Sequence, residues 1–227
     1  MSTVHIQIGE KYFNKDPQST ELGRNIVSES IQLLDQLGFE EFTFKKLANK
    51  IGSTEASIYR YFDNKLKLLV YLTSWYWAWM EYMIDYKTHF IEDQSQKLKE
   101  TIKILCHADQ SLFSMGLPGI KTSVLKRVVA SESDKTYLTK KVDEINNEGL
   151  FKGFKDLCHK IALVVRGFNP DYAYPHAIVS TILEASHQQV FFAQHLPSLT
   201  EISKDSEVSI DHQVYHFIDQ LIFKLLR

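Results

Sequence analysis

Cysteine is scarce in this sequence. The only two, Cys106 and Cys158, stand far apart in apolar helical contexts, and no CxxC spacing surrounds either one. Disulfide-stapled scaffolds and cysteine-based metal sites need several cysteines, so both classes are excluded. We expect two free, buried thiols.

Long hydrophobic runs are also missing. The most hydrophobic window runs from Leu68 to Met80, between Lys67 and Glu81. It is about 13 residues long, whereas a membrane helix needs about 20. The N-terminus is polar and lacks the basic-then-apolar pattern of a signal peptide. We therefore expect a cytoplasmic protein with no membrane contact.

Catalytic motifs are absent as well. The chain has no GxSxG, P-loop, GxGxxG or HExxH. His212 and His216 are four apart, as metal ligands on a helix can be, but no carboxylate motif accompanies them. We therefore expect no enzyme activity, no cofactor and no metal site.

What remains is helical in character. Apolar residues recur at a helical period, glycine and proline mark the breaks, and no strand alternation is convincing after residue 10. The pattern predicts an all-α protein with a first helix that stops at Gly38 and carries Leu37 inward. Further helices are expected at residues 44–51, 55–62, 65–89, 96–114, 118–131, 137–166, 175–195 and 209–226.

The most informative segment is residues 43–65, which has the layout of a helix-turn-helix. Phe44, Leu47, Ala48 and Ile51 form one apolar stripe. Thr43 is placed to cap this helix, Gly52 to end it, and Thr54 to cap a second helix. Such a pair of short helices is typical of DNA-binding proteins, in which the second helix enters the major groove.

Charge supports this interpretation locally but not globally. The whole chain has a formal net charge of −2, yet residues 42–67 carry six lysines and arginines against two acids. A local excess of this size suits salt-sensitive phosphate contacts.

Residues 24–69 resemble the DNA-binding domain of the tetracycline-repressor (TetR) family. The resemblance is carried by Gly38-Phe39, Thr43, Leu47-Ala48, Gly52, Ile58-Tyr59 and Tyr61-Phe62, followed by Lys65. Ser53, Thr54 and Ala56 depart from the residues that the family often has there. Because these positions lie where bases are read, the operator sequence cannot be transferred from a relative.

The resemblance implies a regulator with a specific set of DNA contacts. Tyr59, Tyr61 and Lys65 match positions that hold the DNA backbone in the family, and Glu55, Ala56 and Ser57 occupy the first turn of the reading helix. The full expected DNA-binding set is Thr43, Lys45, Thr54, Glu55, Ala56, Ser57, Tyr59, Arg60, Tyr61 and Lys65.

The last two predicted helices have apolar stripes that suit either the chain's own core or a second copy. The family resemblance implies a four-helix bundle around a two-fold axis, and two readers spaced one DNA turn apart favour a dimer on a palindrome. The expected interface residues are Ile182, Ala185, Gln189, Val214, Phe217, Ile218 and Leu221.

Aromatic residues crowd the helix at 65–89. They are consistent with a tightly packed core, or with a pocket for a small apolar or aromatic effector such as the resemblance implies. The expected ligand-binding residues are Trp79, Tyr82, Met83, His107, Phe113 and Phe154.

The sequence thus predicts an N-terminal arm (residues 1–19), a helix-turn-helix domain (residues 20–67) and a helical effector-binding and dimerisation domain (residues 68–227). The arm is compatible with disorder or with a place along the DNA backbone. We expect a homodimeric regulator, a repressor released from a palindromic operator in double-stranded DNA by a small-molecule effector of unknown identity. The alternative is a helical interaction protein without operator recognition.

Overall fold

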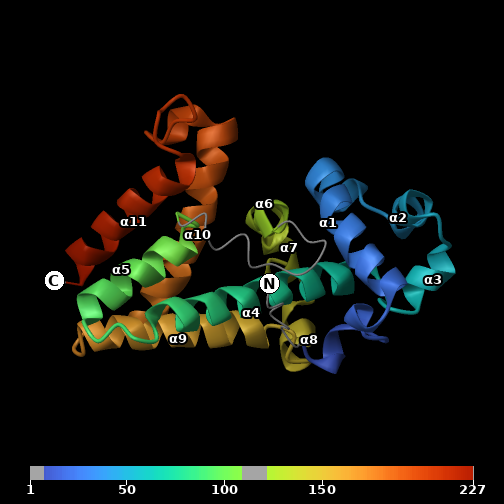
Figure 1. The fold of residues 1–227 in the computed structure, drawn as a ribbon, viewed down its shortest axis with the longest axis horizontal. Helices are drawn as coiled ribbons and strands as arrows, with labels where there is room; N and C mark the ends of the chain where they lie inside the picture. The colour runs from blue at the N-terminus through green and yellow to red at the C-terminus, as the bar shows by residue number, and fades with distance from the viewer. Residues whose placement is uncertain (1–7, 109–121, 227) are drawn as a thin grey trace. The chain divides into compact units, whose positions relative to one another are not determined.

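The computed structural model describes residues 8–108 and 122–226, and every regular element in these ranges is helical (Figure 1). The elements before residue 109 are η1 (Glu10–Tyr12), η2 (Pro17–Ser19), α1 (Glu21–Glu41), α2 (Phe44–Ile51), α3 (Glu55–Tyr59), α4 (Lys65–Thr88) and α5 (Gln94–Leu105). After residue 121 follow α6 (Thr122–Glu132), α7 (Asp134–Tyr137), α8 (Val142–Asn147), α9 (Lys152–Phe168), α10 (Pro175–His195), η4 (Pro197–Leu199) and α11 (Ile210–Leu225). The all-α prediction is confirmed.

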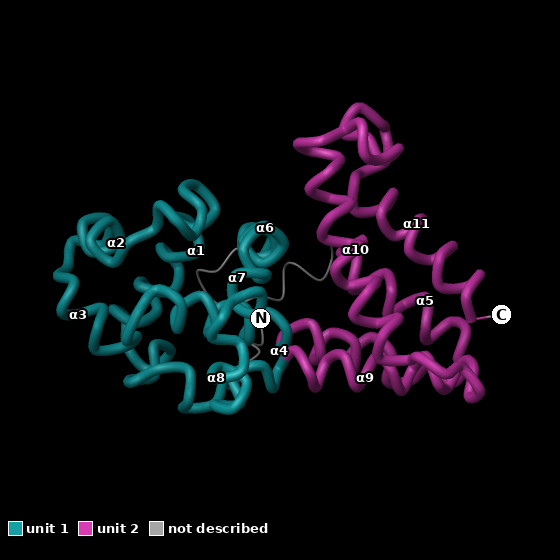
Figure 2. The backbone as a smooth tube through the Cα atoms, turned by 180° about the vertical axis from the view of Figure 1, so that it is seen from behind, with its two compact units in different colours: residues 1–78, 113–153 teal, residues 79–112, 154–227 magenta. Residues whose placement is uncertain are grey.

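The chain packs as two compact units (Figure 2). Unit 1 comprises residues 1–78 and 113–153, and unit 2 comprises residues 79–112 and 154–227. The two units are defined by packing alone, and they do not test the predicted functional boundary between residues 67 and 68. That boundary stays a prediction.

In unit 1, the helix-turn-helix domain is built around a buried apolar core. Ile26, Leu47, Ile58 and Phe62 have no exposed surface. Helix α6 packs along α1 and contributes Val128 and Val129, which are also fully buried. The part of the chain that positions the short helices α2 and α3 therefore includes a segment from residues 122–132.

In unit 2, α10 and α11 run side by side, and α11 also contacts α5 (Figure 1). Leu98 and Ile102 of α5, Val179 of α10, and Val214 and Ile222 of α11 are all fully buried. These side chains form the core of the unit.

Gly38 interrupts the first helix, as predicted. Helix α1 is assigned to Glu21–Glu41, but Gly38 has non-helical dihedral angles, φ 72° and ψ 167°, and a kink at this residue separates residues 39–41 from the main helix. Only glycine adopts this backbone region readily. Leu37, beside the kink, is 38% exposed rather than inward.

The single helix expected at residues 137–166 is divided into the end of α7, α8 and α9. The polar run Asn146-Asn147-Glu148-Gly149 ends α8, and Gly149 has φ 74°. Helix α5 also ends earlier than expected, at Leu105, and the rest of the predicted 96–114 helix reaches residues outside the described ranges.

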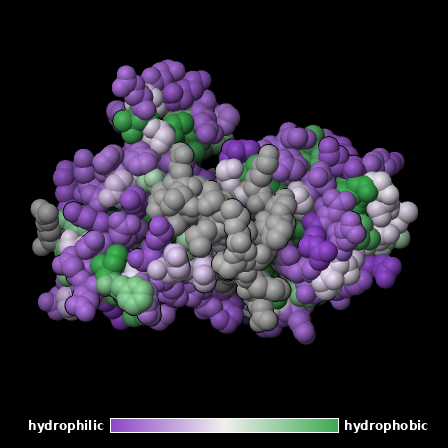
Figure 3. Space-filling model, in the orientation of Figure 1, coloured by the Kyte–Doolittle hydropathy of each residue, from purple (hydrophilic) through white to green (hydrophobic). Residues whose placement is uncertain are grey.

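No helix among the described residues is long and apolar enough to cross a membrane. The face drawn in Figure 3 is mostly hydrophilic, with hydrophobic side chains in small groups.

Candidate DNA-binding surface and effector site

The helix-turn-helix geometry follows from three local residues. Thr43 Oγ1 accepts the Lys46 N–H at 3.2 Å and caps α2, and Thr54 Oγ1 accepts the Ser57 N–H at 3.3 Å and caps α3. Gly52 ends α2 in the left-handed region, at φ 63° and ψ 38°. A side chain at residue 52 would be strained there, so the turn between the helices depends on glycine.

The exposed surface of α3 consists of the residues expected to contact DNA. Glu55, Ala56 and Arg60 are exposed, and Tyr59 is 49% exposed, whereas Ile58 is fully buried. The Tyr59 ring packs edge-on against Phe44, with the ring centroids 5.1 Å apart. The contact with Phe44 therefore orients the tyrosine ring, while about half of the residue remains exposed.

On α2, exposed cations extend this surface. Lys45, Lys46 and Lys50 are all exposed. Lys46 Nζ donates to the Glu41 carbonyl at 2.7 Å and pairs with the Glu41 carboxylate at 3.3 Å. Lys45 and Lys50 have no ion pair within the part of the chain that the structure describes, so both are available for phosphate contact.

Two residues expected to hold the DNA backbone have other partners in the structure. Tyr61 is only 3% exposed, and its hydroxyl is 2.8 Å from Thr20 Oγ1. Lys65 Nζ donates to the carbonyl oxygens of Phe39, Glu40 and Phe42 at 2.9, 3.0 and 3.3 Å. These are the carbonyls left at the kinked end of α1, so Lys65 caps that helix.

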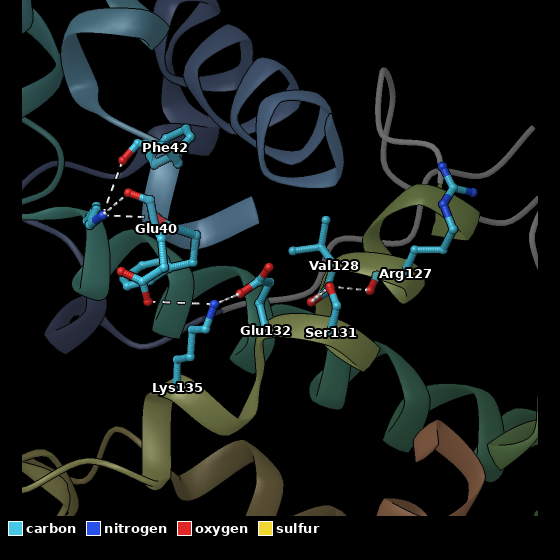
Figure 4. Close-up of polar contacts among 9 residues, drawn as sticks. Glu40, Phe42, Arg127, Val128, Ser131, Glu132 and Lys135 are labelled. Atoms are coloured by element: carbon cyan, nitrogen blue, oxygen red, sulfur yellow. Dashed lines mark hydrogen bonds and ion pairs between the residues drawn. The ribbon is translucent and has the colours of Figure 1, made fainter. Parts of the chain in front are cut away.

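Ion pairs join α1 to α6 and α7 in unit 1. Arg127 makes two hydrogen bonds to the Asp35 carboxylate, at 2.8 and 2.6 Å. Lys135 Nζ lies 2.6 Å from Glu132 and 3.7 Å from Glu40. Both ion pairs are drawn as dashed lines in Figure 4. Sequence reasoning missed the contact of α1 with α6 and α7, because the pairs Arg127–Asp35 and Lys135–Glu40 join residues more than ninety positions apart with no spacing signal.

The residues expected to bind an effector divide into buried and exposed groups. Trp79, Met83 and His107 are at most 2% exposed, and the Trp79 and His107 rings stack with centroids 6.3 Å apart. Tyr82 is 37% exposed and stacks on Tyr86, with the ring centroids 6.2 Å apart. Phe154 is half-buried, and Phe113 lies outside the described residues.

A cavity of about 280 Å³ in unit 2 adjoins this region of α4. Its walls come from the end of α4, the start of α5 and the middle of α9. The lining residues are Ile84, Asp85, Thr88, His89, Gln94, Lys97, Lys160, Leu163 and Val164.

Of the two lysines that line this cavity, Lys160 forms ion pairs with described residues and Lys97 does not. Burial opposes the charge on Lys160, but its ion pairs with Asp85 and Glu81 outweigh burial and raise its pKa. Lys97 has no acidic partner among the described residues. The cavity therefore combines an apolar wall of Ile84, Leu163 and Val164 with an unpaired cation.

The expected dimer residues also divide. Ile182, Val214 and Ile218 are at most 1% exposed within the single chain, and Gln189 accepts a hydrogen bond from Thr200 at 2.6 Å. Ile182, Val214 and Ile218 therefore belong to the core of unit 2. Phe217 is 43% exposed, and Leu225, two turns further along α11, is 51% exposed. Leu221, between them, and Ala185 on α10 are partly exposed.

Neither cysteine takes part in a disulfide: Cys106 is buried and Cys158 half-buried. Burial raises the pKa of the Cys158 thiol to about 11. No cluster of three or more histidine, cysteine or acidic side chains that could hold a metal ion occurs in the described ranges.

Residues 26–72 match the family model of bacterial regulatory proteins, tetR family. No curated protein is significantly similar in sequence.

Several solved structures share the fold over nearly the whole chain. The fatty acid degradation regulator FadR from Bacillus halodurans is 16% identical, with 95% of this chain and 96% of that chain covered and a TM-score of 0.60. The TetR family transcriptional regulator PfmR from Thermus thermophilus is 11% identical, with 88% of this chain and 97% of that chain covered and a TM-score of 0.60. AibR, solved with isovaleryl coenzyme A and operator DNA, is 14% identical, with 94% of this chain and 98% of that chain covered and a TM-score of 0.57. At these identities the similarity establishes the fold alone.

Proposed function

The chain belongs to the TetR family of bacterial regulatory proteins, whose model matches its helix-turn-helix domain, and from this premise we propose that it is a homodimeric repressor of transcription. In this proposal the dimer binds a palindromic operator, and a small molecule releases it. The chain has no catalytic role in this proposal.

The observation that carries the proposal is the exposed first turn of α3. Glu55, Ala56 and Ser57 are presented by a capped helix whose opposite face is held by the fully buried Ile58. In our proposal these three residues contact base edges in the major groove. Thr43, Lys45, Tyr59 and Arg60 contact phosphates beside them, while Thr54, Tyr61 and Lys65 act by holding the helices in place.

A gel-shift titration tests operator binding. A palindromic duplex, chosen by selection from a random pool, should bind saturably and survive an excess of random DNA, with affinity falling steeply as salt rises. Binding that is weak, equal for all sequences and lost at moderate salt would instead support a helical interaction protein without operator recognition.

The effector is proposed to bind unit 2 beside the C-terminal part of α4. The apolar wall of the cavity and the unpaired Lys97 favour a small molecule that combines an apolar group with a negative charge. Helix α4 is continuous from Lys65 to Thr88, so one helix carries residues of both the helix-turn-helix domain and the cavity wall. Binding is proposed to shift the population towards a conformation that holds DNA poorly.

Thermal denaturation with a panel of ligands tests the effector proposal. Isovaleryl coenzyme A, which AibR binds, is a suitable first probe because it carries an acyl group and phosphates. A true effector should stabilise the protein by about 2.7 kcal/mol at a hundred times its Kd and should weaken operator binding. Lys97→Ala should reduce the stabilisation by anionic ligands and leave that by neutral apolar ligands unchanged. If the wild type and Lys97→Ala are stabilised equally by every ligand, this cavity is ruled out as the effector site.

A further inference from the structure

The described part of the N-terminal arm, residues 8–19, lies outside the family match at residues 26–72 and yet bonds to the last residue of α3 and to the turn that follows it. The backbone N–H of Asn14 donates to the Tyr61 carbonyl at 2.8 Å. Its side-chain Nδ2 donates to Asp63 at 2.7 Å and, more weakly, to the Tyr59 carbonyl at 3.5 Å. One arm residue thus contacts the end of α3 and the turn that leads to α4.

Helix α3 needs such support because it is short. It has five helical residues, Glu55–Tyr59, and its last carbonyls have no partners within the helix. A helix this short is not stable alone, so its direction is set by the groups packed around it. Asn14 supplies hydrogen bonds at the end opposite to the cap at Thr54.

The rest of the arm is itself fixed firmly to unit 1. The Tyr12 ring is 6% exposed, and its hydroxyl donates to the Leu150 carbonyl at 3.1 Å. Gln18 Nε2 donates to the Tyr71 hydroxyl at 2.9 Å, and the Phe13 ring packs edge-on against Tyr71. Pro17 lies so close to α1 that a Cβ at Gly23 would come within 2.3 Å of the Pro17 carbonyl oxygen.

We propose that the arm positions the reading helix, with Asn14 as the positioning residue: by holding the segment Tyr59–Asp63, it fixes the orientation in which α3 presents Glu55, Ala56 and Ser57 to the bases. Asn14 acts through α3 and touches no DNA. The inference rests on the proposed operator binding and adds to it an element outside the family match.

The test compares Asn14→Ala with Lys15→Ala in the full chain. Asn14→Ala removes the side-chain bonds and retains the backbone bond to Tyr61. Operator affinity should fall about tenfold, as expected for one charge-assisted hydrogen bond, while random-DNA affinity and the salt slope stay unchanged. Lys15, whose Nζ lies 5.3 Å from the Tyr61 ring centroid, is the control for a direct phosphate contact, whose loss would flatten the salt slope.

Hydrogen exchange without DNA gives a second measurement that does not depend on an operator. Amides of residues 58–63 should exchange faster in Asn14→Ala, while amides of α1 keep their protection. Unchanged exchange would overturn the proposal, as would a lower melting temperature with no change in the ratio of operator to random-DNA affinity. If the wild type prefers no sequence, the proposed function fails, and the exchange data still decide whether the arm holds α3.

Discussion

At the scale of single residues, Lys65 shows how a side chain on a DNA-binding surface can serve the fold. Its ammonium has three donors, and all three point to carbonyls at the kinked end of α1. The same ammonium lies 4.6 Å from the centroid of the Phe39 ring. Removing it leaves these carbonyls without their protein partner.

Lys65→Met should therefore lower stability by about 1–3 kcal/mol. In a chain of this size, each kcal/mol corresponds to about 2–4 °C in melting temperature. Lys45→Ala is the matched control, since Lys45 is exposed: its melting temperature should not change, and its DNA-binding salt slope should flatten by about one unit. If Lys65→Met instead flattens the salt slope at an unchanged melting temperature, Lys65 is a phosphate contact, as the family resemblance implies.

Glu55 is the second residue whose role can be isolated. It is exposed in the first turn of α3, where a carboxylate can accept a hydrogen bond from a cytosine amino group. Glu55→Ala should relax base preference at one position of each half-site, at a cost of about 1–3 kcal/mol in discrimination. Binding-site selection measures this, with Glu21→Ala as a control in the first turn of α1. An unchanged preference would leave Glu55 only its favourable interaction with the helix dipole.

At the scale of elements, the arm and α1 depend on one close approach. Gly23 is helical, so alanine there would raise the intrinsic helix propensity of α1. The added Cβ would nevertheless collide with the backbone of Pro17, at 2.3 to 2.8 Å. Helix propensity therefore favours alanine at position 23, whereas the close packing against Pro17 requires glycine. The packing explains why glycine is present.

Gly23→Ala should displace the arm and weaken operator binding, whereas Asn25→Ala, at an exposed site two residues along α1, should do neither. Limited proteolysis within residues 8–19 measures the displacement, and gel shift measures the binding. Protease resistance and operator affinity equal to those of the wild type would mean that α1 shifts to accommodate the methyl group.

At the scale of the whole molecule, operator reading depends on a second copy of the chain. Two α3 helices must be spaced about 34 Å apart, one turn of DNA, to read both halves of a palindrome. The stripe on α11 formed by the exposed Phe217 and Leu225 and the partly exposed Leu221 is the surface we propose for that pairing. Pairing would remove these apolar side chains from water.

Phe217→Glu should therefore give a folded monomer, because the exposed phenylalanine contributes little to the core of unit 2, while a carboxylate buried between two chains is strongly unfavourable. Light scattering and gel shift should show loss of the dimer and of operator binding together. Gln220→Glu, an exposed position on the same helix, is the charge-matched control and should remain dimeric. A dimeric Phe217→Glu variant would move the interface away from this stripe.

The sequence by itself determined the local features of the fold. Thr43, Gly52 and Thr54 specify a capped helix, a left-handed turn and a second cap through interactions within four residues, so their pattern can be read directly. The extents of α4, α10 and α11 follow similarly from long apolar periodicities and from the breaks that flank them.

Only the tertiary structure decided which partners the side chains at these positions meet. The α11 stripe suits the chain's own core as well as a second copy, and the fold assigns Val214 and Ile218 to the core but leaves Phe217 outside. Lys65 caps α1, Tyr61 is buried beside Thr20, and Asn14 holds α3. Each of these roles depends on a partner more than twenty residues away in the sequence, which only the fold brings into contact. Periodicity records which face of a helix is apolar; it does not record what covers that face.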